Sequence, residues 1–235
     1  MQPSRPRPAA LVGLALAAVA LTGCGPSLGI NPGAAAVVGD RSLSMHTIDS
    51  TSSLYCEALA PLIKQNAPSG VPLSLVRQQV AANLTERLLG EQLAAEYDVQ
   101  PSSEYASAVA NIRQQFGAAS PEALDAGIDV AGGDPYLKTV QLAVGRKLLG
   151  ESGQTSPSDK AAFARGQVAT QDWLKDRDIE VDPSLGVTFT GATPTFERDQ
   201  TSYPVSPLAS QGNANPSGGP DPAYTAALPA SQVCG

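Results

Sequence analysis

Apolar side chains recur at helical spacing on two opposite faces of the stretch from Pro72 to Tyr97. Successive residues of an α-helix turn by about 100°, which places positions three and four apart on one face. One face carries Leu73, Val76, Val80, Leu84 and Leu88, and the opposite face carries Leu75, Ala82, Leu89 and Leu93. Because both faces are apolar, the pattern predicts a helix that is buried on two sides and around which the rest of the chain packs.

Further helical patterns precede and follow this stretch. Ser44 or Thr47 can cap a first helix that runs toward Asn66, and Pro61 is expected to kink or end it. Four later helices are expected to begin near Ser102, Ser120, Asp134 and Ser158. At each of these points a capping side chain or an early proline precedes apolar residues at helical spacing.

Short extended segments lie at both ends of the helical body. Residues 34–43 read as a strand, a turn at Gly39-Asp40 and a second extended piece. The apolar part of this strand needs a partner, and the best candidates are residues 179–181 and 187–189. We therefore expect a mainly α fold with a small β pairing of its N-terminal and C-terminal strands.

The composition changes at about Thr190. From there to Gly235, the residues Pro, Gly, Ser, Thr and Asn are scattered without a helical or a strand period. Such a segment buries too little apolar surface to offset its chain entropy. The expected organisation is a tether at 24–34, a helical domain at 35–189 and a disordered tail at 190–235.

The N-terminus has the pattern of an export signal. Arg5 and Arg7 precede an apolar run from Ala9 to Leu21, which is too short to span a bilayer comfortably. The following Leu21-Thr22-Gly23-Cys24 resembles the lipobox of bacterial lipoproteins. That resemblance implies removal of a signal peptide at 1–23, lipid attachment at Cys24 and a lipid anchor on the outer face of the cell membrane. An ordinary cleaved signal with an incidental cysteine is the alternative.

Charge and cysteine content limit the partners of such an exported protein. Loss of the two arginines of the signal changes the formal net charge from −7 to −9. An acidic protein of this kind is a poor candidate for binding nucleic acid, and its membrane attachment is assigned to the lipid. Cys56 and Cys234 are then the remaining thiols, and an oxidising exterior permits them to pair. The sequence leaves open whether they do.

Residues capable of catalysis are sparse. His46 is the single histidine, and the three cysteines lack the C-x-x-C spacing of redox and zinc motifs. Glu86, Glu91 and Glu96 read as the solvated or partly paired edge of the central helix. We therefore expect no enzyme activity, no metal site and no cofactor.

Aromatic residues offer a candidate binding surface. The candidates for a peptide groove between helices are Tyr105, Phe116, Tyr136, Phe163 and Trp173. Aromatic side chains at helical spacing are also typical of a plain hydrophobic core, so both interpretations stay open.

Three segments resemble the SurA-type N-terminal chaperone domain, which also occurs in actinobacterial lipoproteins. They are residues 37–44, residues 84–104 in part, and residues 173–186. The resemblance implies an orthogonal helical domain in which the first strand meets the last helix and strand. The parvulin prolyl-isomerase domain of related foldases is expected to be absent, because two helices occupy residues 117–157.

Export and this resemblance together suggest two hypotheses. The first is a lipid-anchored extracytoplasmic protein that binds unfolded or partner polypeptides without catalysis. The alternative is a structural or assembly lipoprotein that holds one specific envelope partner.

Overall fold

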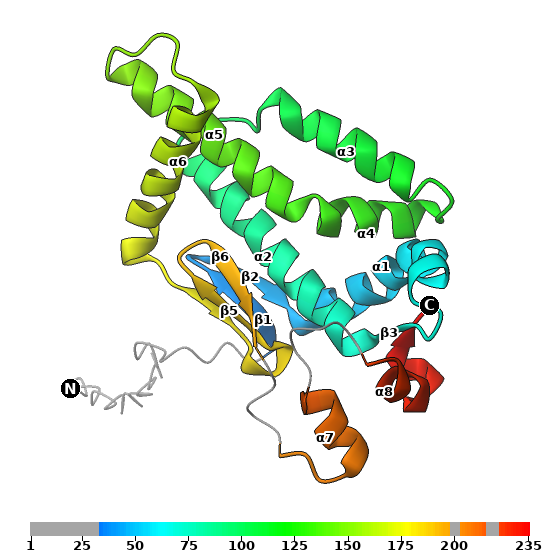
Figure 1. The fold of residues 1–235 in the computed structure, drawn as a ribbon. Coiled ribbons are helices and arrows are strands. Elements are labelled where there is room, and N and C mark those ends of the chain that lie inside the picture. The colour runs from blue at the N-terminus through cyan, green and yellow to red at the C-terminus, as the bar shows by residue number, and fades with distance from the viewer. Residues whose placement is uncertain (1–32, 198–202, 215–220) are drawn as a thin grey trace, which may run out of the picture. The chain divides into compact units, whose positions relative to one another are not determined.

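The computed structural model describes residues 33–197, 203–214 and 221–235 (Figure 1). The expected signal peptide, Cys24 and most of the tether lie outside these residues. Gly33–Gly235 forms one compact unit that contains both hydrophobic clusters of the structure. Because this unit carries its own core, we expect it to fold without residues 1–32.

Helix α2, Leu73–Glu96, lies at the centre of the unit, as the two-faced pattern predicts (Figure 1). Val80, Ala81 and Ala82 are fully buried, and three consecutive positions span about 200° of the helix surface. The prediction of a helix buried on more than one side is therefore confirmed. Leu75 departs from it, because this residue of the first turn is 39% exposed.

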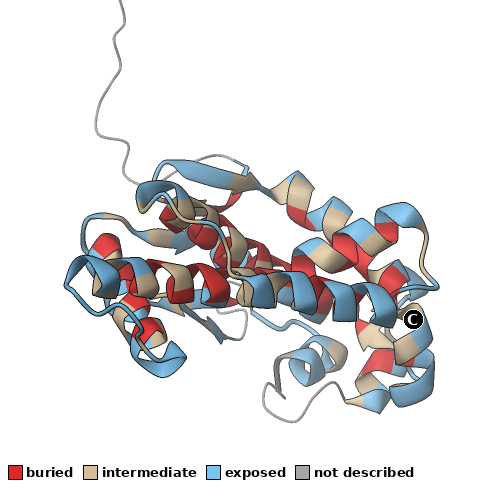
Figure 2. Ribbon diagram, turned by 90° about the horizontal axis from the view of Figure 1, so that it is seen from above, coloured by how far each residue is buried: buried red, intermediate tan, exposed pale blue. Residues whose placement is uncertain are grey.

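The two hydrophobic clusters share this helix along its length. The N-terminal half of α2 packs with α1, Met45–Asn66, and α4, Pro121–Ala131. Its C-terminal half packs with α5, Gly133–Glu151, and α6, Asp159–Trp173. Helix α3, Ser103–Gln115, covers α4 and α5. Figure 2 shows buried and exposed positions side by side along most of the helices.

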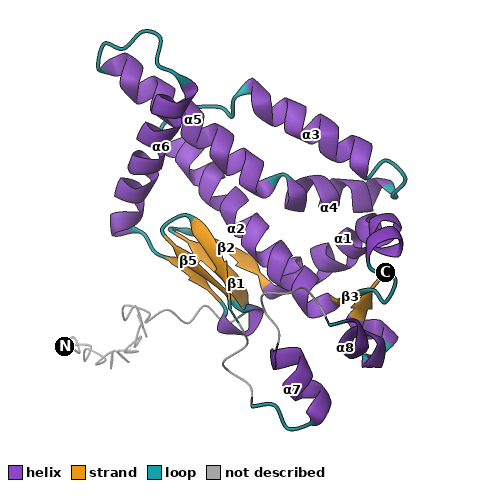
Figure 3. Ribbon diagram, in the orientation of Figure 1, coloured by secondary structure: helices purple, strands orange, loops and turns teal. Residues whose placement is uncertain are grey.

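Helices make up most of the described chain (Figure 3), which confirms a mainly α fold. The hydroxyls of Ser44, Ser120 and Ser158 accept hydrogen bonds from backbone N–H groups in the first turns of α1, α4 and α6. Ser102 occupies the N-cap position of α3 without a side-chain bond, and α5 begins one residue before Asp134.

Pro61 does not end α1, which continues to Asn66. Ala58 and Ile63, on either side of this proline, are buried in the first cluster. Their packing holds the helix together across the backbone hydrogen bond that proline cannot donate.

The first strand pairs with the earlier of its two candidate partners. The sheet order is β2, Arg41–Ser44, then β1, Ala34–Val38, then β4, Ile179–Val181. Val37 lies opposite Glu180 in the antiparallel β1–β4 pair, which confirms the expected pairing of early and late strands. Gly39 forms the β1–β2 turn at a φ of 56°, a conformation that favours glycine. Strand β5, Val187–Thr190, instead forms a hairpin with β6, Thr193–Phe196.

Residues 190–235 contain regular structure in their described parts, contrary to the expected disordered tail. Besides β6, these parts form α7, Pro207–Ala214, α8, Pro222–Ala227, and β7, Val233–Cys234. Strand β7 pairs with β3, Val71–Pro72, just before the central helix. Thr225 and Cys234 are buried. Contacts with the helical domain therefore order the C-terminal segment, although its own apolar content is low.

Candidate functional site

A cleft of about 590 Å³ opens between α2, α5, α6 and the β5–β6 hairpin. Its helical walls come from polar residues with regular spacing. Gln79, Asn83 and Glu86 line it from α2, and Asp134, Lys138 and Gln141 line it from α5. Both sets follow positions i, i+4 and i+7, which form one face of a helix. Two polar faces thus meet over the cleft in an otherwise apolar core.

The hairpin wall is fastened to the central helix by Gln78. The side-chain amide of Gln78 donates hydrogen bonds to the backbone carbonyls of Gly186 and Glu197, which precede β5 and follow β6. The N–H of Glu197 also donates to the carbonyl of Gly186 at 2.8 Å, closing the base of the hairpin. One side chain of α2 therefore fixes the hairpin beside the helix.

Side-chain amides supply much of the hydrogen-bonding capacity of the cleft. Gln167 and Gln171 lie one turn apart on α6 and are exposed. Gln141 is buried, and its Nε2 donates to Thr170 Oγ1 at 3.2 Å, across the α5–α6 contact. An amide both donates and accepts hydrogen bonds. The exposed amides of Gln167 and Gln171 therefore carry the same kinds of donor and acceptor as a polypeptide backbone.

Apolar groups face the same space. Phe163 of α6 is half-buried, and Phe196 of β6 is 46% exposed. Leu137 of α5 and Pro194 of β6 also line the cleft. The cleft therefore offers apolar surface next to polar groups, a combination typical of ligand sites.

Glu86 is the buried charged group of the cleft. Its side chain lines the cavity while the residue is only 5% exposed, and it has no hydrogen-bond partner among the described residues. Burial raises the pKa of Glu86 to about 7, the negative charge of Asp134 adds to this increase, and Lys138 opposes it. Its interpretation as a solvated or paired edge residue is therefore wrong.

The other two glutamates are partly paired, as predicted. Glu91 forms an ion pair with Arg41 at 2.8 Å, and Glu96 forms one with Arg177 at 3.4 Å. These carboxylates lie near the surface, whereas Glu86 lies where α2 meets α5.

The five candidate groove aromatics do not form one groove. Phe116 and Trp173 are buried in different hydrophobic clusters, so the core interpretation holds for them. Tyr105 packs edge-on against Tyr136, with ring centroids 5.1 Å apart. Of the five, Phe163 lines the cleft. Helical spacing could not distinguish core aromatics from cleft aromatics, because it does not indicate which face of a helix packs against which neighbouring element.

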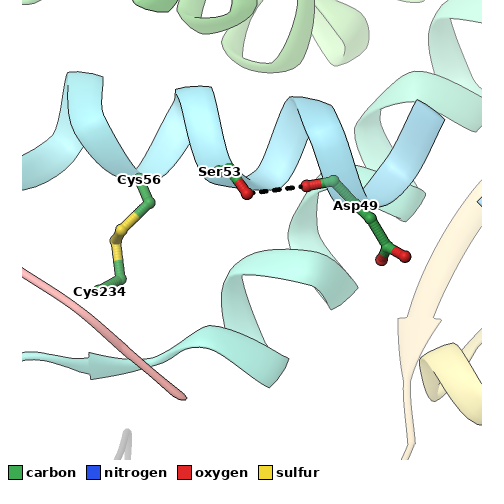
Figure 4. The surroundings of a disulfide bond; sticks show 4 residues. All are labelled: Asp49, Ser53, Cys56 and Cys234. Carbon is green, nitrogen blue, oxygen red and sulfur yellow. Dashed lines mark hydrogen bonds between the residues drawn. A yellow bond between two sulfur atoms is a disulfide. The ribbon is translucent and has the colours of Figure 1, made fainter. Parts of the chain in front are cut away.

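Cys56 of α1 and Cys234 of β7 form a disulfide in the structure (Figure 4). Their Cα atoms are 5.4 Å apart although 178 positions separate them in the sequence. The bond attaches the C-terminal end of the chain to the first helix.

Neither a membrane-spanning helix nor a metal cluster is present in the described parts of the chain. No helix there combines the length and apolar character needed to cross a bilayer. No group of three or more His, Cys, Asp or Glu side chains in these parts is placed to hold a metal ion.

No family model, curated protein or solved structure matches the chain. A function for this protein is therefore inferred from the geometry of the cleft and from the motifs of the sequence.

Proposed function

We propose that this protein is a lipid-anchored extracytoplasmic protein that binds unfolded polypeptide segments in the cleft without catalysing a reaction. The observation that carries the proposal is the lining of the cleft, where side-chain amides face apolar groups. Backbone recognition by amides does not depend on the sequence of the ligand. The apolar groups accept the side chains that an unfolded protein exposes.

The rim strand of the cleft supports the same function. Strand β6 belongs to a two-stranded sheet, so β5 is its one strand neighbour among the described residues. An extended polypeptide can add to such an edge through main-chain hydrogen bonds. Pro194 lies within β6 and contributes no N–H donor, so an added strand would have to pair through the remaining backbone groups of this edge.

The sequence supplies the proposed location. The export signal and the lipobox resemblance at Cys24 suggest a place outside the cytoplasm, where unfolded exported proteins are available as ligands. The partial resemblance to SurA-type chaperone domains suggests the same ligand class.

Aggregation assays on the chain from residue 25 onward test this function. We expect the purified protein to slow the aggregation of a chemically unfolded client. Gln167→Trp, which places a large ring in the cleft, should abolish the effect. Val168→Trp is the matched control, because Val168 is an exposed neighbour on α6 that does not line the cleft. Equal activity of the two variants, or none in the wild type, would contradict the proposal.

Photocrosslinking in cells separates the two hypotheses that the sequence left open. A photoreactive amino acid at position 167 should capture many exported proteins, and the same group at position 168 should capture few. One dominant partner at position 167 would instead favour the assembly lipoprotein.

A further inference from the structure

The Glu86 carboxylate stands out in the cleft because no described side chain forms a hydrogen bond or an ion pair with it. Only 5% of the surface of Glu86 is exposed, yet this residue lines the cavity. A buried ionised carboxylate without a partner is costly, and proteins generally pair such groups or keep them protonated. A ligand that brings a positive charge would remove that cost.

Within the described parts of the chain, Glu86 is the one charged residue of the cleft lining whose charge is not balanced by an ion pair. From α5, Lys138 Nζ contacts Asp134 Oδ2 at 2.8 Å, so these two groups largely cancel each other. The residues that face the cleft from α6 and from the hairpin are uncharged. When Glu86 is ionised, the cleft therefore carries about one negative charge.

We propose that Glu86 makes the cleft selective for polypeptide segments that carry a lysine or arginine side chain. This inference rests on the proposed function and names its ligand class. The cationic group pairs with the Glu86 carboxylate, and the aliphatic part of the side chain lies along apolar residues such as Leu137 and Phe163. The amides of the cleft bind the neighbouring backbone.

The ionisation of Glu86 sets the pH dependence of this selectivity. The pKa of Glu86 is raised to about 7, so the carboxyl is mostly neutral at pH 6 and mostly ionised at pH 8. Selectivity for a cation should therefore increase as the pH rises through 7. A bound cation should also lower the pKa of Glu86, because it favours the charged form.

Matched peptides provide the test. Fluorescently labelled peptides, blocked at both ends, share one neutral apolar sequence with a central lysine, arginine or norleucine. Their affinities for the chain from residue 25 onward are measured by fluorescence anisotropy at pH 6 and pH 8. We expect the lysine and arginine peptides to bind about tenfold more tightly than the norleucine peptide at pH 8, since a charge-assisted hydrogen bond contributes on that order. This preference should shrink at pH 6.

Two variants and a control assign the preference to Glu86. Glu86→Gln should remove it, so that the lysine, arginine and norleucine peptides bind with similar affinity at pH 8. Glu57→Gln should keep it, because this exposed residue of α1 makes the same charge change outside the cleft. Lys138→Gln should increase it, because it leaves Asp134 unneutralised. If Glu86→Gln does not fold, the loss of the preference between pH 8 and pH 6 in the wild type serves as the test.

The outcomes distinguish the two proposals. If no peptide binds, the proposed function fails. If the peptides bind with equal affinity at pH 8, or if Glu86→Gln keeps the preference, the inference about Glu86 is overturned and the binding function stands. A preference that grows at pH 6 would also overturn it, because that would indicate a protonated Glu86 acting as a hydrogen-bond donor.

Discussion

Gly145 of α5 lies directly against the backbone carbonyl of Ala162 in α6, with no room for a side chain between them. The same contact is repeated one turn further on, where Gly166 of α6 lies against the carbonyl of Gln141. Two glycines thus bring the helix backbones together. Because α5 and α6 form walls of the cleft, this close approach also fixes its width.

We predict that Gly145→Ala destabilises the protein. A methyl group at this position would overlap the Ala162 carbonyl oxygen, so the helices must separate. Overpacking of this kind costs about 1–3 kcal/mol in the free energy of unfolding. Urea denaturation followed by the fluorescence of Trp173, the single tryptophan, measures the change.

Gly150→Ala is the matched control for this prediction. Gly150 belongs to the same helix, is exposed, and has no atom within 4 Å of the place where a Cβ would lie. Alanine should stabilise this position by about 0.5–1 kcal/mol because it favours helix. Equal effects of the two substitutions would contradict the close contact.

The disulfide should contribute measurably to stability. Its loop spans 178 positions, and disulfides that close long loops typically stabilise by about 2–4 kcal/mol. Replacing both Cys56 and Cys234 by serine should lower the free energy of unfolding by such an amount. Ser53→Ala, on the exposed side of α1 near this bond, should change it by less than about 0.5 kcal/mol (Figure 4).

Thiol titration checks the bond directly. The chain from residue 25 onward, denatured without reductant, should show no free thiol, and reduction should release both. Free thiols before reduction would show that the bond does not form.

Lipid attachment at Cys24 is tested by metabolic labelling with a fatty-acid analogue. The wild-type protein should carry the label and sediment with membranes. Cys24→Ala should lose both properties, whereas Cys56→Ala should keep them because that thiol is not at the predicted cleavage site. Label retained by Cys24→Ala would rule out the lipobox interpretation.

The sequence predicted those parts of the fold that repeat a regular pattern. The central helix was visible because residues 80–82 and their neighbours place apolar groups on several faces. The β1–β4 pair was visible because few extended apolar segments exist. The regular structure near the C-terminus could not be predicted, because β3 and β7 contain two residues each and are too short to show an alternation of apolar and polar residues. Their position depends on Cys56 and Cys234, whose pairing the sequence could not decide.

The candidate site was predictable in its parts and not in its assembly. The polar residues Gln79, Asn83 and Glu86 follow helical spacing within a largely apolar helix, and this is the signal that could have identified the cleft. Nothing local indicates that Asp134 and Lys138 face them from another helix. Burial of Glu86 follows from this tertiary contact, so the spacing of the glutamates alone could not reveal it.

Glu86 should make the stability of the free protein depend on pH. Its pKa is about 7 in the folded protein and near 4.5 when the chain is unfolded, so the folded state holds the proton more tightly. The resulting stabilisation is complete below pH 4.5 and is lost as the pH rises through 7. This difference in pKa corresponds to about 3 kcal/mol in the free energy of unfolding. Relative to Glu86→Gln, the wild type should therefore lose stability between pH 5 and pH 8.

Thermal unfolding of the two proteins measures this difference at each pH. The melting temperature of Glu86→Gln should exceed that of the wild type by several degrees more at pH 8 than at pH 5, since about 1 kcal/mol corresponds to roughly 2–4 °C in a domain of this size. Glu57→Gln, at an exposed position of α1, is the control for the same change of charge away from the cleft. A constant offset between wild type and Glu86→Gln across this pH range would mean that Glu86 is ionised without cost. The carboxylate would then have a partner in the free protein, and the cleft would have no unpaired charge to offer a cationic ligand.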